Sequence, residues 1–96
     1  MPNSALRRDA AEQLARTLQA IADPTRLQIL SFIHGTPGGE SMVKDLTDYL
    51  GLRQPTVTYH LRVMAAEGLV VRRAEGRRAW FSIAPDRLES IADLLD

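Results

Sequence analysis

The segment LGLRQPTVTYHLRVM, which begins at Leu50, constrains the fold more than any other part of this chain. Gly51 can adopt the left-handed backbone conformation that commonly ends a helix. Pro55 fits the first turn of a following helix, where its missing N–H costs nothing. The segment therefore predicts a tight turn that leads directly into a helix. Apolar residues then recur at spacings of four and three, which places them on one buried helix face: Val57, Leu61 and Met64.

The opposite face of this predicted helix carries side chains that form hydrogen bonds. A solvated helix face usually alternates glutamate with lysine, but this face has no acidic residue before Glu67. Glutamine, threonine, tyrosine and arginine are side chains that bond to base edges and to phosphates. We therefore predict that the face binds double-stranded DNA. The predicted contact residues are Gln54, Pro55, Thr56, Thr58, Tyr59 and Arg62.

The segments on either side support the same interpretation. Residues 42–50 predict a short helix, and the DNA-facing helix starts only a few residues later, which is the spacing of a helix-turn-helix. Two β-prone runs flank a glycine-containing, arginine-rich turn and predict a β-hairpin. A helix-turn-helix at about residues 42–66, followed by a basic wing at about residues 69–83, is a winged helix-turn-helix. Unless the wing is merely solvated, its arginines should contact phosphates: Arg72, Arg73, Arg77 and Arg78.

Apolar periodicity predicts further helices at residues 5–22, 24–33 and 85–96, whereas the glycine and proline content of residues 34–41 predicts a loop. The predicted fold is thus mainly α-helical, of the α+β class, with the order α-α-α-α-β-β-α. In so short a chain the first and last helices cannot all be covered internally, so we expect them to form a dimer interface. The alternative is that they only cap the core. The apolar residues predicted for the interface are Leu14, Leu18, Ile21, Leu88, Ile91 and Leu95.

The distribution of charge supports a DNA partner, although the formal net charge is zero. A neutral total argues by itself against a nucleic-acid-binding protein. Residues 53–78, however, hold six arginines and two glutamates, a net charge of +4, and the rest of the chain carries the balancing negative charge. Of the twelve basic residues only Lys44 is not arginine, and arginine makes forked contacts to phosphate and guanine that lysine cannot make.

Length and composition limit the other possibilities. A chain of 96 residues suits one domain, residues 1–96. It has no cysteine, and therefore no disulfide or thiolate chemistry. No apolar run approaches the ~18 residues of a membrane span, and the first residues lack the pattern of a secretory signal, so we expect a cytoplasmic protein without a membrane partner. No glycine-rich phosphate loop or supported catalytic set is present, so we expect no enzymatic activity.

Several motifs in a fixed order resemble the ArsR/SmtB family of small bacterial winged-helix repressors. They are LQAIADPTRLQIL at residues 18–30, VKDL at residues 43–46, QPTVTYHLRVM at residues 54–64, and EGLV at residues 67–70 with the later pair Gly76-Arg77. The resemblance covers essentially the whole chain. It implies a homodimer that binds an operator, represses transcription and leaves the DNA when an inducer binds. Many members of the family sense metal ions or metalloids.

The chain departs from this family in the residues that hold metals. Members that bind soft metals or arsenite use cysteine pairs, often where this chain has Ser41–Lys44. Others use aspartate and histidine on the last helix, which here has no histidine, and zinc prefers nitrogen and sulfur ligands. His34 in the loop and His60 in the DNA-facing helix form no ligand set. We therefore predict no metal site and no cofactor. The last helix offers carboxylates that suit a solvated acidic face: Asp86, Glu89, Asp93 and Asp96.

Three forms of regulation stay open: an organic or redox-inert small-molecule inducer, another form of control, and constitutive repression. Two other functions also stay open. One is a metal- or metalloid-responsive repressor with an atypical site. The other is a winged-helix protein–protein interaction module that has lost DNA binding, although such a module would be expected to lose the basic wing and the polar helix face. A nucleic-acid chaperone without sequence preference would not need the Gln/Thr/Tyr face.

Overall fold

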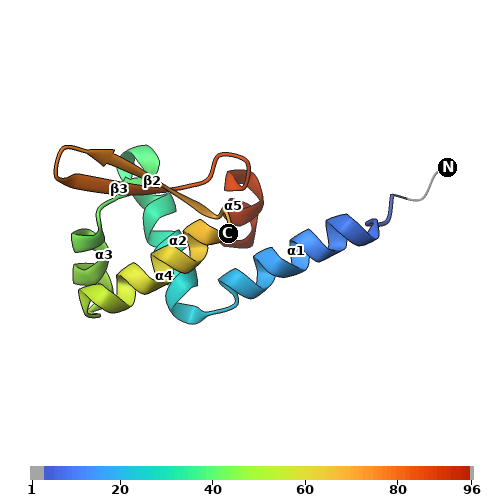
Figure 1. Ribbon diagram of the computed structural model, residues 1–96, viewed down its shortest axis with the longest axis horizontal. Helices are drawn as coiled ribbons and strands as arrows, with labels where there is room; N and C mark the ends of the chain where they lie inside the picture. Colours follow the sequence, from blue (N-terminus) through green and yellow to red (C-terminus); the bar gives the residue numbers. More distant parts are fainter. Residues whose placement is uncertain (1–3, 96) are drawn as a thin grey trace.

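The computed structural model describes residues 4–95, which fold into five α-helices and a three-stranded antiparallel sheet (Figure 1). This confirms the winged helix-turn-helix fold. Of the acidic residues expected on the last helix, Asp96 lies outside the described residues. The elements are α1 (Arg8–Ile21), α2 (Pro24–Gly35), the 3₁₀ turn η1 (Pro37–Gly39), β1 (Glu40–Ser41), α3 (Val43–Leu50), α4 (Gln54–Ala66), β2 (Val70–Glu75), β3 (Arg78–Ile83) and α5 (Leu88–Leu95).

Helix α2 forms the centre of the core and contacts α1, α3, α5 and the sheet. Its side chains Ile29, Leu30 and Ile33 are fully buried. The predicted stripe of α4 packs in the same cluster, together with Leu46 from α3 and with buried residues of the sheet and α5. Truncating any of the fully buried α2 side chains to alanine should cost about 2–5 kcal/mol, so the core fixes where α4 lies.

The helix-turn-helix is made by α3 and α4. Gly51 has a φ of 68°, and its N–H donates to the carbonyl of Thr47 at 2.9 Å, which ends α3 in the expected left-handed conformation. Pro55 lies in the first turn of α4, where no N–H is needed. The short turn between the helices therefore follows from local sequence, and it projects the outer face of α4 away from the core.

The strand β1 is the main difference from the expected element order, because residues 34–41 were expected to form a loop. Glu40 pairs with Ser82 and Ser41 pairs with Phe81, which makes β3 the central strand. Ser41 is only 2% exposed, and its hydroxyl donates to the carbonyl of Met42 at 3.0 Å. A two-residue strand has no periodicity, and only its pairing with a distant strand defines it.

The wing is the β2–β3 hairpin, closed by the two-residue turn Gly76-Arg77 between the paired residues Glu75 and Arg78. Gly76 has a φ of 61°, and glycine at the first central position is typical of a type II′ turn, whose twist matches that of the strands. This turn places the wing arginines at and beside the tip of the hairpin.

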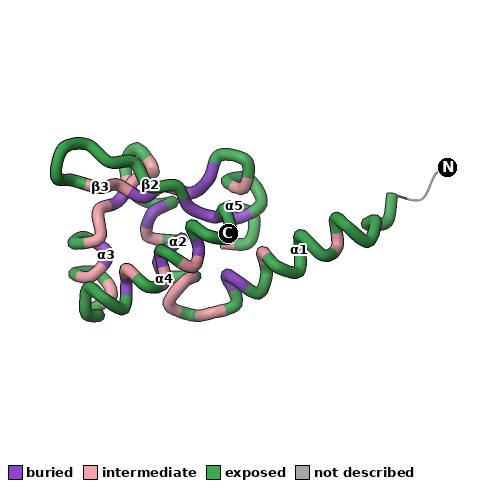
Figure 2. The backbone as a smooth tube through the Cα atoms, viewed as in Figure 1, coloured by how far each residue is buried: buried purple, intermediate pink, exposed green. Residues whose placement is uncertain are grey.

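Helix α1 extends away from the rest of the molecule (Figure 1), which measures 52 × 24 × 23 Å along its principal axes. The helix starts at Arg8, three residues later than expected, and only Ala20 and Ile21 in its last turn are buried. In Figure 2 the tube of α1 has the colour of exposed residues along most of its length. Within residues 4–95, none of the helices combines the length and apolar character required to cross a membrane.

Candidate nucleic-acid interface

The outer face of α4 gathers most of the residues predicted to contact DNA. Gln54, Pro55, Thr58, Tyr59 and Arg62 line a single hollow, which we call the α4 hollow. Tyr59 protrudes from it with 59% of its surface exposed. The sixth predicted residue of this helix, Thr56, is exposed but does not line the hollow. The face thus presents an amide, a hydroxyl, a phenol and a guanidinium to solvent.

A groove between α4 and the sheet brings Arg72 to the same surface. Gln54, Thr58 and Arg62 line this groove from the helix, and Arg72 lines it from β2. The register explains the orientation of Arg72. It pairs with Phe81, whose side chain is buried, so Arg72 stands on the face of the sheet that turns toward α4. Arg72 therefore extends the basic surface of the helix onto the wing.

Arg73 lies on the opposite face of the sheet, because successive residues of a strand point to opposite sides. Its guanidinium donates to both carboxylate oxygens of Glu40, at 2.9 and 3.1 Å, and to Glu75 at 2.7 Å. It also lies 5.7 Å from the ring centroid of Trp80. Arg73 therefore ties β1 to the base of the wing, and its two carboxylate partners disfavour the predicted contact with phosphate.

The pKa of Glu40 reflects this pairing. The hydrogen bonds that Arg73 donates, together with its charge, lower the pKa of the Glu40 carboxyl, and the same bonds to Glu40 and Glu75 raise the pKa of Arg73. A lowered carboxyl pKa means that the pair stabilises the fold above the ordinary glutamate range. That contribution is lost as the pH falls through the lowered pKa. Arg77 and Arg78, at the tip of the wing, are exposed.

Comparison with known proteins identifies this arrangement. Residues 23–71, which run from the residue that caps α2 into β2, match the family model described as "Bacterial regulatory protein, arsR family". The chain belongs to the ArsR family. The matched segment includes both helices of the helix-turn-helix and the whole α4 hollow, so this ArsR-family protein is a DNA-binding transcriptional regulator.

Transcriptional regulators from several bacteria match most of the chain. The HTH-type transcriptional regulator NmtR of Mycobacterium tuberculosis is 39% identical over 95 residues, which cover 99% of this chain and 74% of NmtR. The probable mercury resistance operon repressor of Streptomyces lividans is 36% identical over 84% of this chain and 60% of its own length. The homodimeric winged helix-turn-helix domain of a possible ArsR-family regulator from Mycobacterium bovis has a TM-score of 0.77 and 29% identity, with 99% and 86% covered.

The six residues predicted for the dimer interface of the ArsR-family chain differ in their exposure. Leu14, Leu18 and Leu88 are exposed, as an interface requires. Ile21 and Ile91 are only 4% and 2% exposed and pack in the core of the single chain, which disfavours them as interface residues. Leu95 is partly buried against the core and stays a predicted interface residue. Of the other exposed leucines, Leu6 was missed by the sequence pattern, and Leu94 was the alternative that the pattern offered to Leu95.

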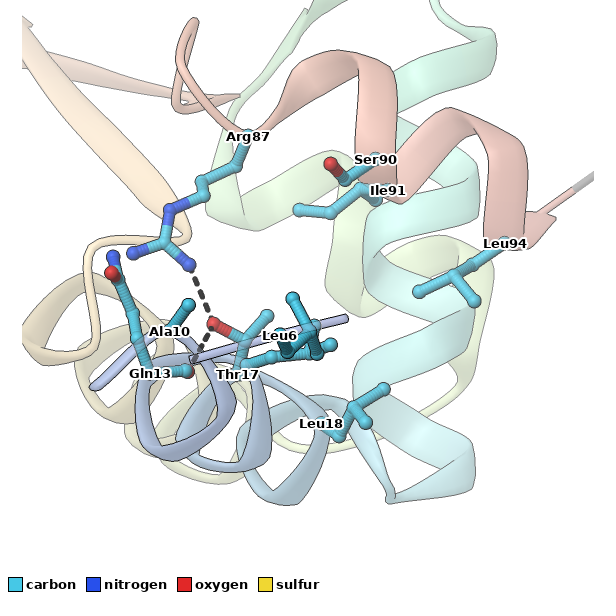
Figure 3. Close-up of a pocket in the computed structure, with 10 residues that line it drawn as sticks. Leu6, Ala10, Gln13, Thr17, Leu18, Arg87, Ser90, Ile91 and Leu94 are labelled. Carbon is cyan, nitrogen blue, oxygen red and sulfur yellow. Dashed lines mark hydrogen bonds between the residues drawn. The ribbon is translucent and has the colours of Figure 1, made fainter. Parts of the chain in front are cut away.

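Four of these leucines, Leu6, Leu14, Leu18 and Leu94, line a pocket of about 330 Å³ between α1 and α5 (Figure 3). We call Leu6, Leu14, Leu18, Leu88 and Leu94 the α1–α5 apolar surface. At the edge of the pocket, Arg87 donates to the hydroxyl of Thr17 at 2.5 Å, as the dashed line in Figure 3 shows. This bond links α1 to the segment that leads into α5, so the two helices present their leucines together.

The donor set of the chain does not fit the metals that members of this family sense. Across residues 4–95, the side chains of histidine, aspartate and glutamate form no group of three or more that could hold a metal ion. The chain has no thiol. His34 is exposed in the last turn of α2, whereas His60 accepts a hydrogen bond from Arg26 of the same chain. The absence of a metal site stays a prediction.

Proposed function

We propose that this ArsR-family protein is a homodimeric transcriptional repressor. It would bind a palindromic operator through α4 and the basic wing and leave it in response to a signal other than a metal ion. The α4 hollow is the observation that carries the proposal, because Gln54, Thr58, Tyr59 and Arg62 converge there beside Arg72. The proposal includes a cytoplasmic location, where the DNA is, and no catalytic step.

The chemistry of the α4 hollow suits the major groove. The groove admits an α-helix, and each base pair presents a distinct pattern of donors and acceptors there. The amide of Gln54 can bond to both adenine positions, and the guanidinium of Arg62 suits guanine or a phosphate. Arg72 lies at the same surface and Arg77 lies at the wing tip, where each can neutralise a backbone phosphate. Recognition by α4 and attraction by the wing would thus act on one duplex.

The sparse packing of α1 against its own chain supports dimerisation. This helix of 14 residues is held to its own chain mainly by its last turn, and helices of that length are marginal in water without packing. Its exposed Leu14 and Leu18 lie next to Leu94 of α5 in the α1–α5 apolar surface. A second copy of the chain, related by a two-fold axis, would cover this surface and place two α4 helices about 34 Å apart for successive half-sites. The M. bovis neighbour is described as homodimeric.

The proposal is tested with the DNA that lies upstream of the gene and with a shuffled duplex of equal length. We expect a Kd of roughly 10⁻⁸ to 10⁻¹¹ M for the operator, at least ~10³-fold tighter than for the shuffled duplex at the same salt concentration. Transcription from that DNA in vitro should fall as the protein is added. Equal affinity for both duplexes would refute sequence-specific binding. A chain that does not bind DNA or heparin at low salt would instead support the protein–protein interaction module.

Arg77→Ala should weaken binding to all DNA sequences and reduce its salt dependence. Each neutralised phosphate contributes roughly 0.9 to the slope of log K against log salt, so a dimer that loses one contact per subunit should lose about two. The slope is measured by titrating operator at several salt concentrations. Arg73→Ala is the matched control, because its guanidinium already serves Glu40 and Glu75. An unchanged slope in the Arg77→Ala/Arg78→Ala double variant would show that the wing does not touch DNA.

Transition metals and arsenite should leave the operator complex intact. Their sites in proteins draw on thiolate or imidazole, and this chain has no thiol and two histidines in different elements. The measurement is a titration of operator-bound protein with zinc, cadmium, nickel, copper(I) and arsenite at low micromolar concentration. A dimer doubles the donors, so His34 or Met42 could meet its counterpart in the other subunit. Release of DNA by any of these ions, abolished by His34→Asn or His60→Asn, would reinstate a metal sensor with an atypical site.

A further inference from the structure

Arg26 joins three helices at one corner of the molecule. Its Nη1 donates to the carbonyl of Ala20 at 3.0 Å, near the C-terminal end of α1, where helix carbonyls lack partners. Its Nε donates to Nδ1 of His60 in α4 at 3.1 Å. Its backbone N–H donates at 3.1 Å to Asp23, which caps α2. All three bonds are partly buried, and the two that the guanidinium makes restrict its position.

The bond to His60 fixes the state of that imidazole. A nitrogen that accepts a hydrogen bond carries no proton, so this bond requires a neutral imidazole with its proton on Nε2. The ring of His60 meets the ring of Tyr59 edge to face, with centroids 5.5 Å apart and planes at 64°. A continuous set of contacts therefore runs from the end of α1 through Arg26 and His60 to the residue that protrudes from the α4 hollow.

We propose that Arg26 and His60 are positioning residues for DNA binding: they hold Tyr59 and α4 in a fixed orientation relative to α1, and protonation of His60 releases that hold. The proposal rests on the proposed contact between Tyr59 and DNA and deepens it. It adds a physical link between the helix that we expect to dimerise and the helix that we expect to read the operator.

The charged groups around His60 favour a change of partner on protonation. Protonated histidine donates from both nitrogens, so it cannot accept from Arg26, and it places a second positive charge beside the guanidinium. Asp23 lies near enough for the charge of His60 to lower the pKa of its carboxyl, which the backbone N–H of Arg26 lowers most. The last turn of α1, residues 18–21, has no titratable side chain. The protonated ring is thus repelled by Arg26 and attracted by Asp23.

The test compares operator affinity from about pH 8 to pH 5.5, the range in which histidines titrate. Affinity of the parent should fall roughly three- to tenfold on acidification, the worth of one hydrogen bond. His60→Asn keeps an acceptor near the position of Nδ1 and does not titrate, so it should match the parent at pH 8 and lose the pH dependence. His60→Ala should bind three- to tenfold more weakly at every pH. His34→Asn is the matched control and should keep the parental profile.

Binding to a random duplex gives the sign of the effect. An added positive charge alone strengthens attraction to phosphate, so random-sequence affinity should rise or stay constant at low pH while operator affinity falls. If parent and His60→Asn have the same pH profile, the positioning role is refuted.

A measurement without DNA separates this proposal from the proposed function. The ¹⁵N chemical shifts of His60 should show the Nε2–H tautomer in the parent at high pH and a mixture in Arg26→Ala. A dominant Nδ1–H tautomer in the parent would refute the positioning role of Arg26 and His60 even if the protein binds its operator. The expected tautomer in a protein that binds no operator would refute only the proposed function.

Discussion

Leu18→Asp should convert the protein to a monomer and lower its operator affinity by roughly 10²- to 10⁴-fold, the gain that two linked binding events normally provide. Leu18 is 44% exposed in the single chain, so the substitution places a charge on the α1–α5 apolar surface without entering the core. The variant chain should still fold, but it should not dimerise, because the interface would bury an unpaired carboxylate. Sedimentation at micromolar concentration measures the assembly, and operator titration measures the affinity.

Two further variants sharpen this test. Leu94→Asp, on the other helix of the same surface, should give the same result. Gln19→Asp is the matched control, because it adds the same charge to the adjacent exposed position of α1, about 100° around the helix from Leu18. Circular dichroism of each variant checks that the helices beyond α1 persist. A parent protein that sediments as a monomer would refute the proposed dimer, and a dimeric Leu18→Asp variant would place the interface elsewhere.

Gln54→Ala and Tyr59→Ala should each weaken operator binding by about 1–3 kcal/mol, the worth of a good contact to a base. Both residues are exposed and line the α4 hollow, so truncation should not disturb the core. Binding to a random duplex should change little, because attraction to phosphates carries that affinity. The two affinities are measured side by side at one salt concentration, and their ratio reports specificity.

The outcome separates base recognition from general attraction. A parallel loss on operator and random duplex would assign Gln54 and Tyr59 to the DNA backbone. If both variants bind both duplexes like the parent, α4 is not the recognition helix. Thr56→Ala extends the test, because Thr56 is exposed on the same helix outside the hollow. It should cost less than either of the other two substitutions.

The helix-turn-helix could be predicted from the sequence because its determinants are local. Gly51 ends one helix through its own backbone conformation, and the stripe of α4 is a spacing within one segment. The strand β1 could not be predicted in this way, because two residues show no period and their pairing with β3 spans half the chain. The pairing of Arg73 could not be predicted for the same reason: its partner Glu40 is 33 positions away and reaches it only through β1.

The apolar stripes of α1 and α5 were visible in the sequence, but their division between core and surface was not. Leu94 and Leu95 are adjacent leucines about 100° apart around α5, and periodicity does not show which of them packs inward. In the structure Leu95 packs against the core and Leu94 is exposed. Arg26 and His60, 34 positions apart, also needed the packing of α4 against the corner of α1 and α2 before their contact could be seen.

Because helix α1 protrudes, the folding of this protein should depend on its concentration. A helix with so little support from its own chain gains most of its order when a second copy arrives, so assembly and the last step of folding become one equilibrium. Thermal stability should therefore rise with protein concentration, and a protease should cut α1 first in dilute solution. In a cell, newly made chains at low abundance would carry an unprotected N-terminal segment. Degradation could then clear them before enough copies accumulate to occupy DNA, which would set a threshold for repression.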